Sequence, residues 1–260
     1  MNLETIKGTQ LLQRAFEIIN LLAKNPKGLN LSKISEFTSI PISTAHRILQ
    51  FLIQNDYIRN NKITGQNYLG SRFVLFSSVF FQNFDFLKEI RPGIINLNEE
   101  FDETVHIGIL NNKGSKVIYI DKQESSRAVR MFSIIGQTVP IHCTSLGKAL
   151  FASLTAQESN EILERYDFQK FTETTITKKK DFLIEIEKVK KLGYAVDNRE
   201  NENNIICYGK SFYNHYNQTT AAVSISIPDY RFGEKNIERV VESLTNTVEW
   251  FEKKLAILQL

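Results

Sequence analysis

The sequence predicts an α+β protein: an N-terminal winged helix-turn-helix, a connecting helix, and a larger C-terminal domain of strands and helices. Three observations support this fold class. Apolar residues recur at helical spacing through the first 54 residues, and two short alternating segments follow them. Beyond residue 104, strand-like runs that end in turn-forming residues are interrupted by helical stretches, which is typical of a mixed sheet covered by helices.

The size and composition are those of a globular protein. The chain has 260 residues, of which 42% are apolar and 23% are charged. Its longest apolar stretch, Phe73–Phe81, contains two serines and is far shorter than the roughly 20 residues of a membrane helix. Glu4 and Lys7 argue against a signal peptide, and two cysteines are too few for a disulfide framework. We expect a cytoplasmic protein without a membrane partner.

The charge is unevenly distributed along the chain. Residues 1–80 hold 9 Lys and Arg against 4 Asp and Glu, whereas residues 81–260 hold 23 against 25. A basic segment attached to a nearly neutral body suggests that only the first part meets an anionic macromolecule.

Two helices are expected first. The helix from Thr9 to Leu22 has apolar positions at Leu11, Leu12, Ala15, Phe16, Ile18, Ile19 and Leu22. A short second helix, capped by Asn30 or Ser32, directs Leu31, Ile34 and Phe37 inward. The segment Thr38–Pro41 then forms a tight turn.

A third helix begins after the turn, with Pro41 tolerated in its first turn. Its inner face carries Ala45, Ile48, Leu49 and Leu52, and its outer face carries Ser43, Thr44, Arg47 and Gln50. Hydroxyl and guanidinium groups suit phosphate oxygens and base edges in a major groove, and Ile42 adds an apolar contact for a thymine methyl. Two short helices joined by such a turn form a helix-turn-helix.

A wing follows in residues 57–59 and 66–69, which alternate as two strands around a polar turn. The series Pro41–Leu49, Tyr57-Ile58 and Tyr68–Gly70 resembles the winged helix-turn-helix of the isocitrate lyase regulator (IclR) family of bacterial transcription factors. The sequence departs from the family at Ser39, where glycine is usual, and at Ile42, where a polar residue is frequent. The DNA-binding residues that we predict are Ile42, Ser43, Thr44, His46, Arg47, Gln50, Arg59 and Lys62.

The rest of the chain supplies a connector and a second domain. Ser71–Gln82 is expected to be a buried or dimerising helix, and it divides the chain into residues 1–82 and 83–260. An amphipathic segment, Phe86–Phe101, is expected to break at Pro92-Gly93. Strands are expected at Val105–Leu110, Lys116–Asp121, Val129–Phe132, Tyr194–Asp197, Ile205–Phe212 and Thr220–Ile227, and helices at Ser145–Leu154, Asp181–Leu192 and Asn236–Leu258.

The resemblance extends over this second domain through Val139–Leu150, Gly193–Asp197 and Ala221–Ser226. It implies a GAF-like domain that binds a small-molecule effector, modulates operator binding and assembles into dimers or tetramers. The family's effector contacts fall on Ser145, Leu146, Asp197, Cys207, Ser224 and Ser226.

The residues themselves support an effector site. A helix that opens at residue 144 or 145 presents N–H groups without intrahelical partners, which suit a carboxylate. Ser224 and Ser226 share one face of a strand, so their hydroxyls converge. Asp197 can accept a hydrogen bond from a ligand hydroxyl, and Cys207 offers a small, apolar wall.

Two alternatives remain open at this stage. A small-molecule hydrolase would draw on Cys143, Cys207, His106, His142, Asp197 and Ser224, although nothing spaces them as a catalytic motif. A metal- or redox-responsive regulator would use His142, Cys143 and Cys207, which are zinc-ligand types in an unusual spacing.

The function we predict is that of a DNA-binding transcriptional regulator, not an enzyme. Its operator affinity responds to a small carboxylate or sugar-acid effector. We expect no catalytic residue, cofactor or resident metal. One N-terminal domain covers only a short stretch of DNA, and operators are commonly palindromic, so we expect at least a homodimer.

Overall fold

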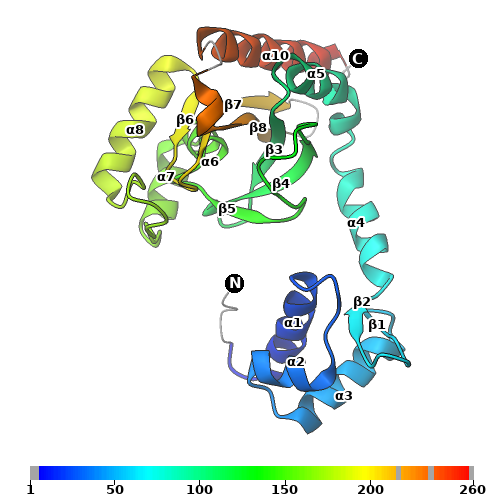
Figure 1. The fold of residues 1–260 in the computed structure, drawn as a ribbon. Helices are drawn as coiled ribbons and strands as arrows, with labels where there is room; N and C mark the ends of the chain where they lie inside the picture. The colour runs from blue at the N-terminus through cyan, green and yellow to red at the C-terminus, as the bar shows by residue number, and fades with distance from the viewer. Residues whose placement is uncertain (1–5, 215–217, 234–236, 258–260) are drawn as a thin grey trace. The chain divides into compact units, whose positions relative to one another are not determined.

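The structure is a computed structural model that describes residues 6–214, 218–233 and 237–257. The chain forms two compact units, residues 1–84 and residues 85–260. The fold class expected from the sequence is confirmed in each unit, which we describe separately (Figure 1).

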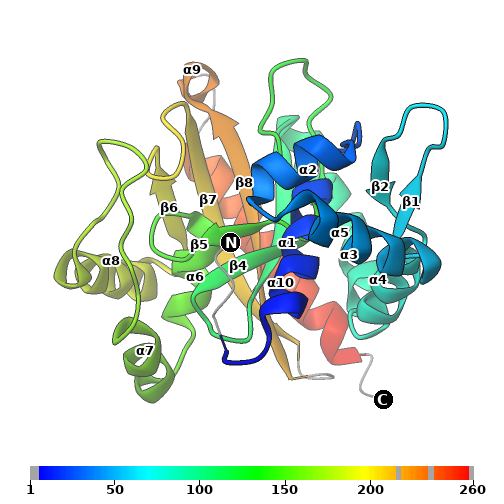
Figure 2. The same ribbon diagram turned by 90° about the horizontal axis from the view of Figure 1, so that it is seen from below.

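The N-terminal unit packs three helices against a two-stranded wing (Figure 2). Its elements are α1 (Gln10–Ala23), α2 (Leu31–Thr38), α3 (Ile42–Gln54), β1 (Ile58–Asn60), β2 (Asn67–Leu69) and α4 (Arg72–Gln82). Its core combines Ile18 and Leu22 of α1 with Ile34 of α2 and the inner face of α3. Phe37, expected to face inward, is 58% exposed, because the two-turn α2 reaches its neighbours only through the face of Ile34.

The C-terminal unit is built on one antiparallel sheet with the order β5-β4-β3-β8-β7-β6. Its strands are β3 (Thr104–Leu110), β4 (Lys116–Gln123), β5 (Thr138–Pro140), β6 (Ala195–Asn198), β7 (Ile205–Asn214) and β8 (Thr219–Pro228). Its helices are α5 (Phe86–Phe101), α6 (Ser145–Ala152), α7 (Ala156–Leu163), α8 (Lys179–Leu192), α9 (Asp229–Phe232) and α10 (Ile237–Ile257).

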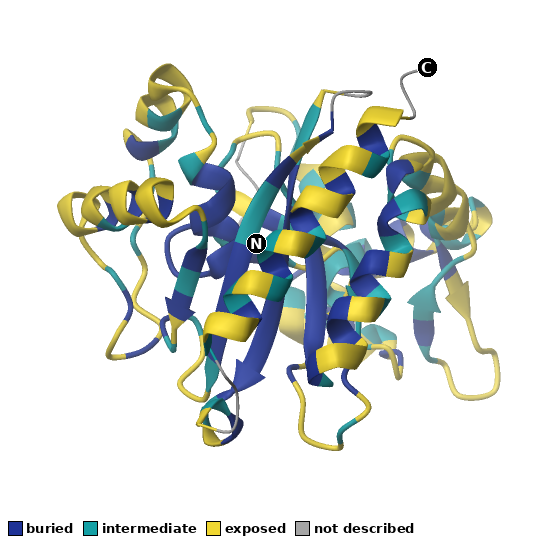
Figure 3. Ribbon diagram, turned by 90° about the horizontal axis from the view of Figure 1, so that it is seen from above, coloured by how far each residue is buried: buried dark blue, intermediate teal, exposed yellow. Residues whose placement is uncertain are grey.

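The two faces of this sheet are covered differently. Helices α5 and α10 lie side by side over one face and turn their buried stripes toward it (Figure 3). Helix α6 contacts the opposite face through β7, β8 and β3, with α8 outside it (Figure 1). Side chains alternate along a strand, so Ser224 and Ser226 belong to the α6 face while Val223 and Ile225 lie on the other.

The expected break in Phe86–Phe101 is wrong, since α5 runs through Pro92 as one helix. Packing against α10 holds it together there. A Cβ at Gly93 would lie 2.7 Å from Phe251 and 3.0 Å from Trp250, so a glycine is needed where the two helices meet.

Other boundaries also differ from the expectation. Val129–Phe132 forms no strand, and the edge strand is instead β5, whose Thr138–Pro140 pairs with Lys116–Ile118. Helix α7 was not expected, although Thr155 and Glu158 form a capping box at its start. The last helix is confirmed in its described part, whereas its expected end residues 236 and 258 lie outside the described residues.

Candidate functional site

The first candidate site is the outer face of α3. The helix buries Ala45, Ile48, Leu49 and Leu52, as its periodicity predicts. All eight predicted DNA-binding residues are left wholly or partly exposed: Ile42, Ser43, Thr44, His46, Arg47, Gln50, Arg59 and Lys62. Gln50 Nε2 lies 3.4 Å from His46 Nε2 on this face. The helix therefore presents polar and cationic groups in one strip.

The turn before α3 adopts a left-handed backbone without a glycine. Ser39 has a φ of 56°. Its neighbours stabilise the turn, because Ser35 Oγ donates to the carbonyl of Ile40 at 2.6 Å and Thr38 Oγ1 donates to that of Ile34 at 2.6 Å. Ser39, at a position where the family usually has glycine, is thus compatible with the helix-turn-helix geometry.

The wing is a short hairpin anchored to the helices. Asn67 exchanges backbone hydrogen bonds with Leu29 at 2.8 and 3.1 Å, and its buried side chain donates to the same carbonyl. Arg59 lies over the ring of Tyr68 at 4.4 Å, a cation-π contact that holds its guanidinium on the hairpin surface. Lys62 sits in the exposed turn. Both cations are therefore available to a polyanion.

Helix α4 carries an uncovered apolar surface. None of its described residues is buried. The large apolar side chains exposed on it are Val74, Leu75, Phe76, Val79 and Phe80, while Leu11, Leu12 and Phe16 are exposed on α1. Such a concentration on a helix is typical of an interaction surface.

The second candidate site lies on the α6 face of the large sheet. The strand register places Asp197, Cys207 and Ser226 opposite one another on β6, β7 and β8. One step along, Ser224 pairs with Gly209 on β7 and with His106 on β3. The sheet thus brings together the predicted residues from three strands that lie far apart in the sequence.

The N-terminus of α6 closes this face. Thr144 is the cap, and its side chain accepts a hydrogen bond from the N–H of Gly147 at 3.1 Å. A Cβ at Gly209 would lie 2.9 Å from the carbonyl of Ser145, so this glycine lets the helix end approach the sheet. The Leu146 side chain is buried in the core cluster that also contains Tyr119.

Two serines of this site have hydroxyls without a partner among the described residues. Ser145 is 2% exposed and Ser224 is 3% exposed. Neither hydroxyl belongs to the fully buried side-chain atoms that lack a hydrogen bond, so each keeps some accessible surface. Two accessible hydroxyls in otherwise buried residues beside a helix N-terminus are an arrangement that suits a ligand.

Asp197 is held in place by backbone groups. Its Oδ1 accepts hydrogen bonds from the N–H groups of Glu200 at 2.7 Å and Asn201 at 3.4 Å. Burial raises the pKa of Asp197 to about 7, against the effect of these hydrogen bonds. Both the ionised and the protonated form of Asp197 are therefore populated near neutral pH, so its side chain can accept or donate a hydrogen bond there.

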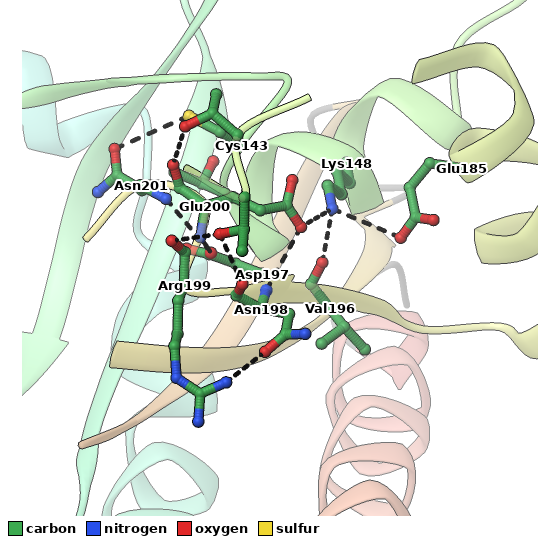
Figure 4. Close-up of polar contacts among 12 residues, drawn as sticks. Cys143, Lys148, Glu185, Val196, Asp197, Asn198, Arg199, Glu200 and Asn201 are labelled. Carbon is green, nitrogen blue, oxygen red and sulfur yellow. Dashed lines mark hydrogen bonds and ion pairs between the residues drawn. The ribbon is translucent and has the colours of Figure 1, made fainter. Parts of the chain in front are cut away.

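A buried lysine ties α6 to the Asp197 turn (Figure 4). Lys148 Nζ, which is fully buried, lies 2.5 Å from Glu200 Oε1, 2.7 Å from the carbonyl of Val196 and 3.4 Å from Glu185 Oε1. Burial raises the pKa of Glu200 even though Lys148 opposes the shift. This ion pair was not anticipated, because nothing in the local sequence shows that a lysine in a helix will be buried.

The structure also adds His106, Tyr119 and Ser133 to the site. His106 is 1% exposed, and one ring nitrogen lies 2.8 Å from Ser133 Oγ while the other lies 3.5 Å from Ser226 Oγ. Its ring stacks on Tyr119 with centroids 4.7 Å apart. Sequence reasoning considered His106 only as part of a hydrolase, and the missing information was the pairing of β3 with β8, which places His106 beside Ser224, and with β4, which adds Tyr119.

The metal and hydrolase alternatives are not supported. No cluster of three His, Cys, Asp or Glu that could hold a metal occurs among the described residues. His142 instead contacts the hydroxyl of Tyr166 at 2.7 Å and the carbonyl of Gln169 at 3.0 Å. Burial raises the pKa of the Cys143 and Cys207 thiols, which disfavours the nucleophilic thiolate.

Family models and curated proteins match both parts of the chain. The family model for the C-terminal part of the bacterial transcriptional regulator IclR matches residues 79–251, and the IclR helix-turn-helix model matches residues 11–62. The HTH-type transcriptional repressor AllR of Escherichia coli (strain K12) is 30% identical over 228 residues, which are 88% of this chain and 83% of AllR.

Solved structures show the same architecture. The crystal structure of Thermotoga maritima IclR has 30% identity and a TM-score of 0.76, covering 94% of this chain and 98% of that one. An IclR homolog from Microbacterium hydrocarbonoxydans, complexed with 4-hydroxybenzoate, has 18% identity and a TM-score of 0.80, covering 95% and 100%. The second likeness is one of fold alone.

Proposed function

The chain belongs to the IclR family of bacterial transcriptional regulators, and from this premise we propose how its two parts divide the work. Residues 1–82 bind operator DNA through α3 and the wing. Residues 83–260 bind a small carboxylate effector, and effector binding changes the affinity for DNA. The observation that carries the effector part is the pair of nearly buried serines, Ser145 and Ser224, whose hydroxyls have no partner among the described residues and lie beside the α6 N-terminus.

The DNA-binding part is supported by the outer strip of α3. We expect Arg47→Ala to weaken binding at least tenfold, because Arg47 is the cation on that strip. The probe is a DNA fragment selected from a random library with the wild-type protein, titrated by gel shift. Lys190→Ala, which removes an equal charge from α8, is the control and should bind as the wild type does. An unchanged titration for Arg47→Ala contradicts the assignment of α3.

The regulator acts as a homodimer, or as a tetramer made of dimers, in this proposal. A second copy covers the apolar surface of α4, since single-copy exposure of Phe76 and Phe80 together is unfavourable in water. Phe76→Asp is expected to shift the sedimentation-equilibrium mass toward that of one chain. A monomeric wild-type protein contradicts this part of the proposal.

The effector is a carboxylate in this proposal because the N–H groups of Ser145 and Leu146, which precede the Gly147 N–H bonded to Thr144, and the Ser145 hydroxyl can all donate to it. The fold-related Microbacterium homolog, which is complexed with the acid 4-hydroxybenzoate, is consistent with this class. A thermal-shift screen of metabolic acids tests it. Ser145→Ala and Ser224→Ala should each lose most of the shift, and stabilisation only by neutral compounds contradicts it.

We also propose that the protein acts in the cytoplasm and catalyses no reaction. The described residues contain no helix long and apolar enough to cross a membrane. The thiols of the site are kept protonated by burial, so binding and not bond cleavage is the activity that its chemistry supports.

A further inference from the structure

We propose that the protein carries a second small-molecule site, away from the effector face of the sheet, and that this site binds a nucleoside monophosphate. The site is a hollow of about 410 Å³ at β5, the edge strand of the large sheet (Figure 1). The start of β4, β5 itself, His142 and the loop of residues 165–171 line it. Ser145, Asp197 and Ser224 do not line this hollow, so the inference goes beyond the proposed function.

The floor of the hollow is a closed set of hydrogen bonds. His142 is 1% exposed, and its Nε2 donates to the carbonyl of Gln169 at 3.0 Å. Burial lowers the pKa of His142, so the ring is neutral and its Nδ1 accepts from the Tyr166 hydroxyl at 2.7 Å. The Tyr166 oxygen accepts in turn from the N–H of Ile141 at 3.2 Å. The floor therefore fixes the shape of the hollow and leaves recognition of a ligand to the walls.

The walls carry two cations without partners. Lys116 opens β4 and Arg165 follows α7, and both line the hollow. Within the described residues neither side chain makes an ion pair or a hydrogen bond, whereas the nearby Lys170 pairs with Glu173 at 2.8 Å. An anion in the hollow is attracted by both cations, and a guanidinium can hold two phosphate oxygens at once. A phosphate monoester, with a charge of roughly −2 at neutral pH, matches this pair.

Phe171 adds an aromatic surface to the same hollow. It is 41% exposed, although its ring lies 6.1 Å from that of His142. An exposed ring on the wall of a hollow is a platform on which a planar base can stack, whatever the identity of the base. Asp167 and the side-chain amide of Gln169, on the same loop, can meet N–H and hydroxyl groups of a base or a ribose.

These groups together select the class of ligand. Inorganic phosphate or a sugar phosphate would use Lys116 and Arg165 but leave Phe171 uncovered. An uncharged nucleoside would stack on Phe171 but leave both cations without a counter-ion. A nucleoside monophosphate engages the cations, the aromatic ring and the acceptor Asp167. The volume of the hollow lies within the range of roughly 300–1,000 Å³ that is usual for small-molecule sites.

Isothermal titration calorimetry with AMP, adenosine and ribose 5-phosphate tests this ligand class. Adenosine lacks the phosphate and ribose 5-phosphate lacks the base, so each removes one of the two recognised groups. We expect AMP to bind the wild-type full-length protein with a Kd below about 1 mM and at least about tenfold more tightly than either fragment, since a stacked base or a paired phosphate is worth about a factor of ten or more.

Single variants locate the bound AMP. Arg165→Ala and Lys116→Ala remove the phosphate partners, and each should weaken AMP binding about tenfold. Phe171→Leu keeps an apolar side chain but removes the stacking ring, and it should also weaken AMP binding about tenfold. All three residues are exposed, so circular dichroism should show that the variants stay folded.

Three control variants should bind AMP as the wild type does. Lys170→Ala removes a cation from the same loop, but one that is paired with Glu173. Phe132→Leu removes an aromatic ring that is 78% exposed elsewhere on the C-terminal unit. Ser224→Ala alters the proposed effector site on the sheet face and leaves the hollow at β5 intact.

Four outcomes overturn the inference. Absence of AMP binding at about 5 mM, where a millimolar site is mostly filled, removes the site. Adenosine that binds as tightly as AMP shows that the cations do not hold a phosphate, and ribose 5-phosphate that binds as tightly shows that no base stacks on Phe171. AMP binding that is lost in Ser224→Ala but unchanged in Arg165→Ala places the ligand on the sheet face. None of these outcomes alters the gel-shift and thermal-shift tests of the proposed function, so the two proposals fail separately.

Discussion

Replacing Lys148 by Met is expected to destabilise the C-terminal unit strongly. The change removes the cation that lies 2.5 Å from Glu200 Oε1 and leaves the 8% exposed Glu200 side chain without a counter-ion. The other carboxylate oxygen of Glu200 is already buried without a hydrogen bond to any described residue. Breaking a buried ion pair in this way costs about 3–5 kcal/mol. In a unit of this size that corresponds to a fall in Tm of about 10 °C.

The loss should depend on pH with a defined sign. Burial already raises the pKa of Glu200, and removing Lys148 raises it further. The folded state then favours a protonated Glu200, so the destabilisation is greatest at alkaline pH and shrinks as the pH falls through the raised folded value. Urea unfolding at pH 8 and at pH 5 measures this, with the fluorescence of Trp250, the single tryptophan, as the signal for the C-terminal unit.

Two further variants show whether the ion pair is responsible. Lys148→Met combined with Glu200→Gln removes the carboxylate that the single change leaves without its counter-ion, so much of the lost stability should return. Lys190→Met breaks only the exposed pair with Glu187 on α8, and it should change the free energy of unfolding by about 0.5 kcal/mol or less. The reasoning fails if Lys148→Met costs less than 1 kcal/mol at pH 8, or if the double variant is as unstable as the single one.

Three other predictions concern the two sites. Asp197→Asn should stabilise the protein at pH 8 by up to about 4 kcal/mol, because the pKa of about 7 makes the wild type lose stability as the pH rises from 4 to 7. Urea unfolding should therefore show a flatter dependence of the unfolding free energy on pH, and a variant that keeps the wild-type slope refutes this. Gly209→Ala should abolish acid binding in the calorimeter, since its Cβ would lie 2.9 Å from the Ser145 carbonyl, and wild-type affinity refutes it. Gel shifts at several salt concentrations test Arg59, because log affinity falls with log salt in proportion to the number of phosphates contacted. Arg59→Ala should make this negative slope shallower by about 0.9 per protomer, whereas an unchanged slope shows that Arg59 does not contact a phosphate.

The N-terminal unit was predictable because its signals are local. Helical spacing identified the buried face of α3, Asn30 was a recognisable cap, and the polar turn marked the wing. The apolar residues of α1 and α4 were equally visible, but their exposure was not, since spacing shows which residues share a face and not what covers that face.

The C-terminal unit was less predictable because its order depends on distant contacts. Pro92 suggested a broken helix, yet α10 packs against Gly93 and keeps α5 continuous. Val129–Phe132 had the composition of a strand, but the edge of the sheet pairs with Thr138–Pro140 instead. In both places tertiary packing outweighed a local signal.

The sequence alone predicted the division of the chain, the polar outer face of α3 and the residues Ser145, Asp197, Cys207, Ser224 and Ser226 as a set, because spacing and family resemblance act on local segments. Only the tertiary structure decided that a curled sheet brings β3 and β4 to that set, and with them His106 and Tyr119. It also decided that Lys148 is buried as a counter-ion. Strand order and burial depend on contacts between residues far apart in the chain, and no local pattern encodes them.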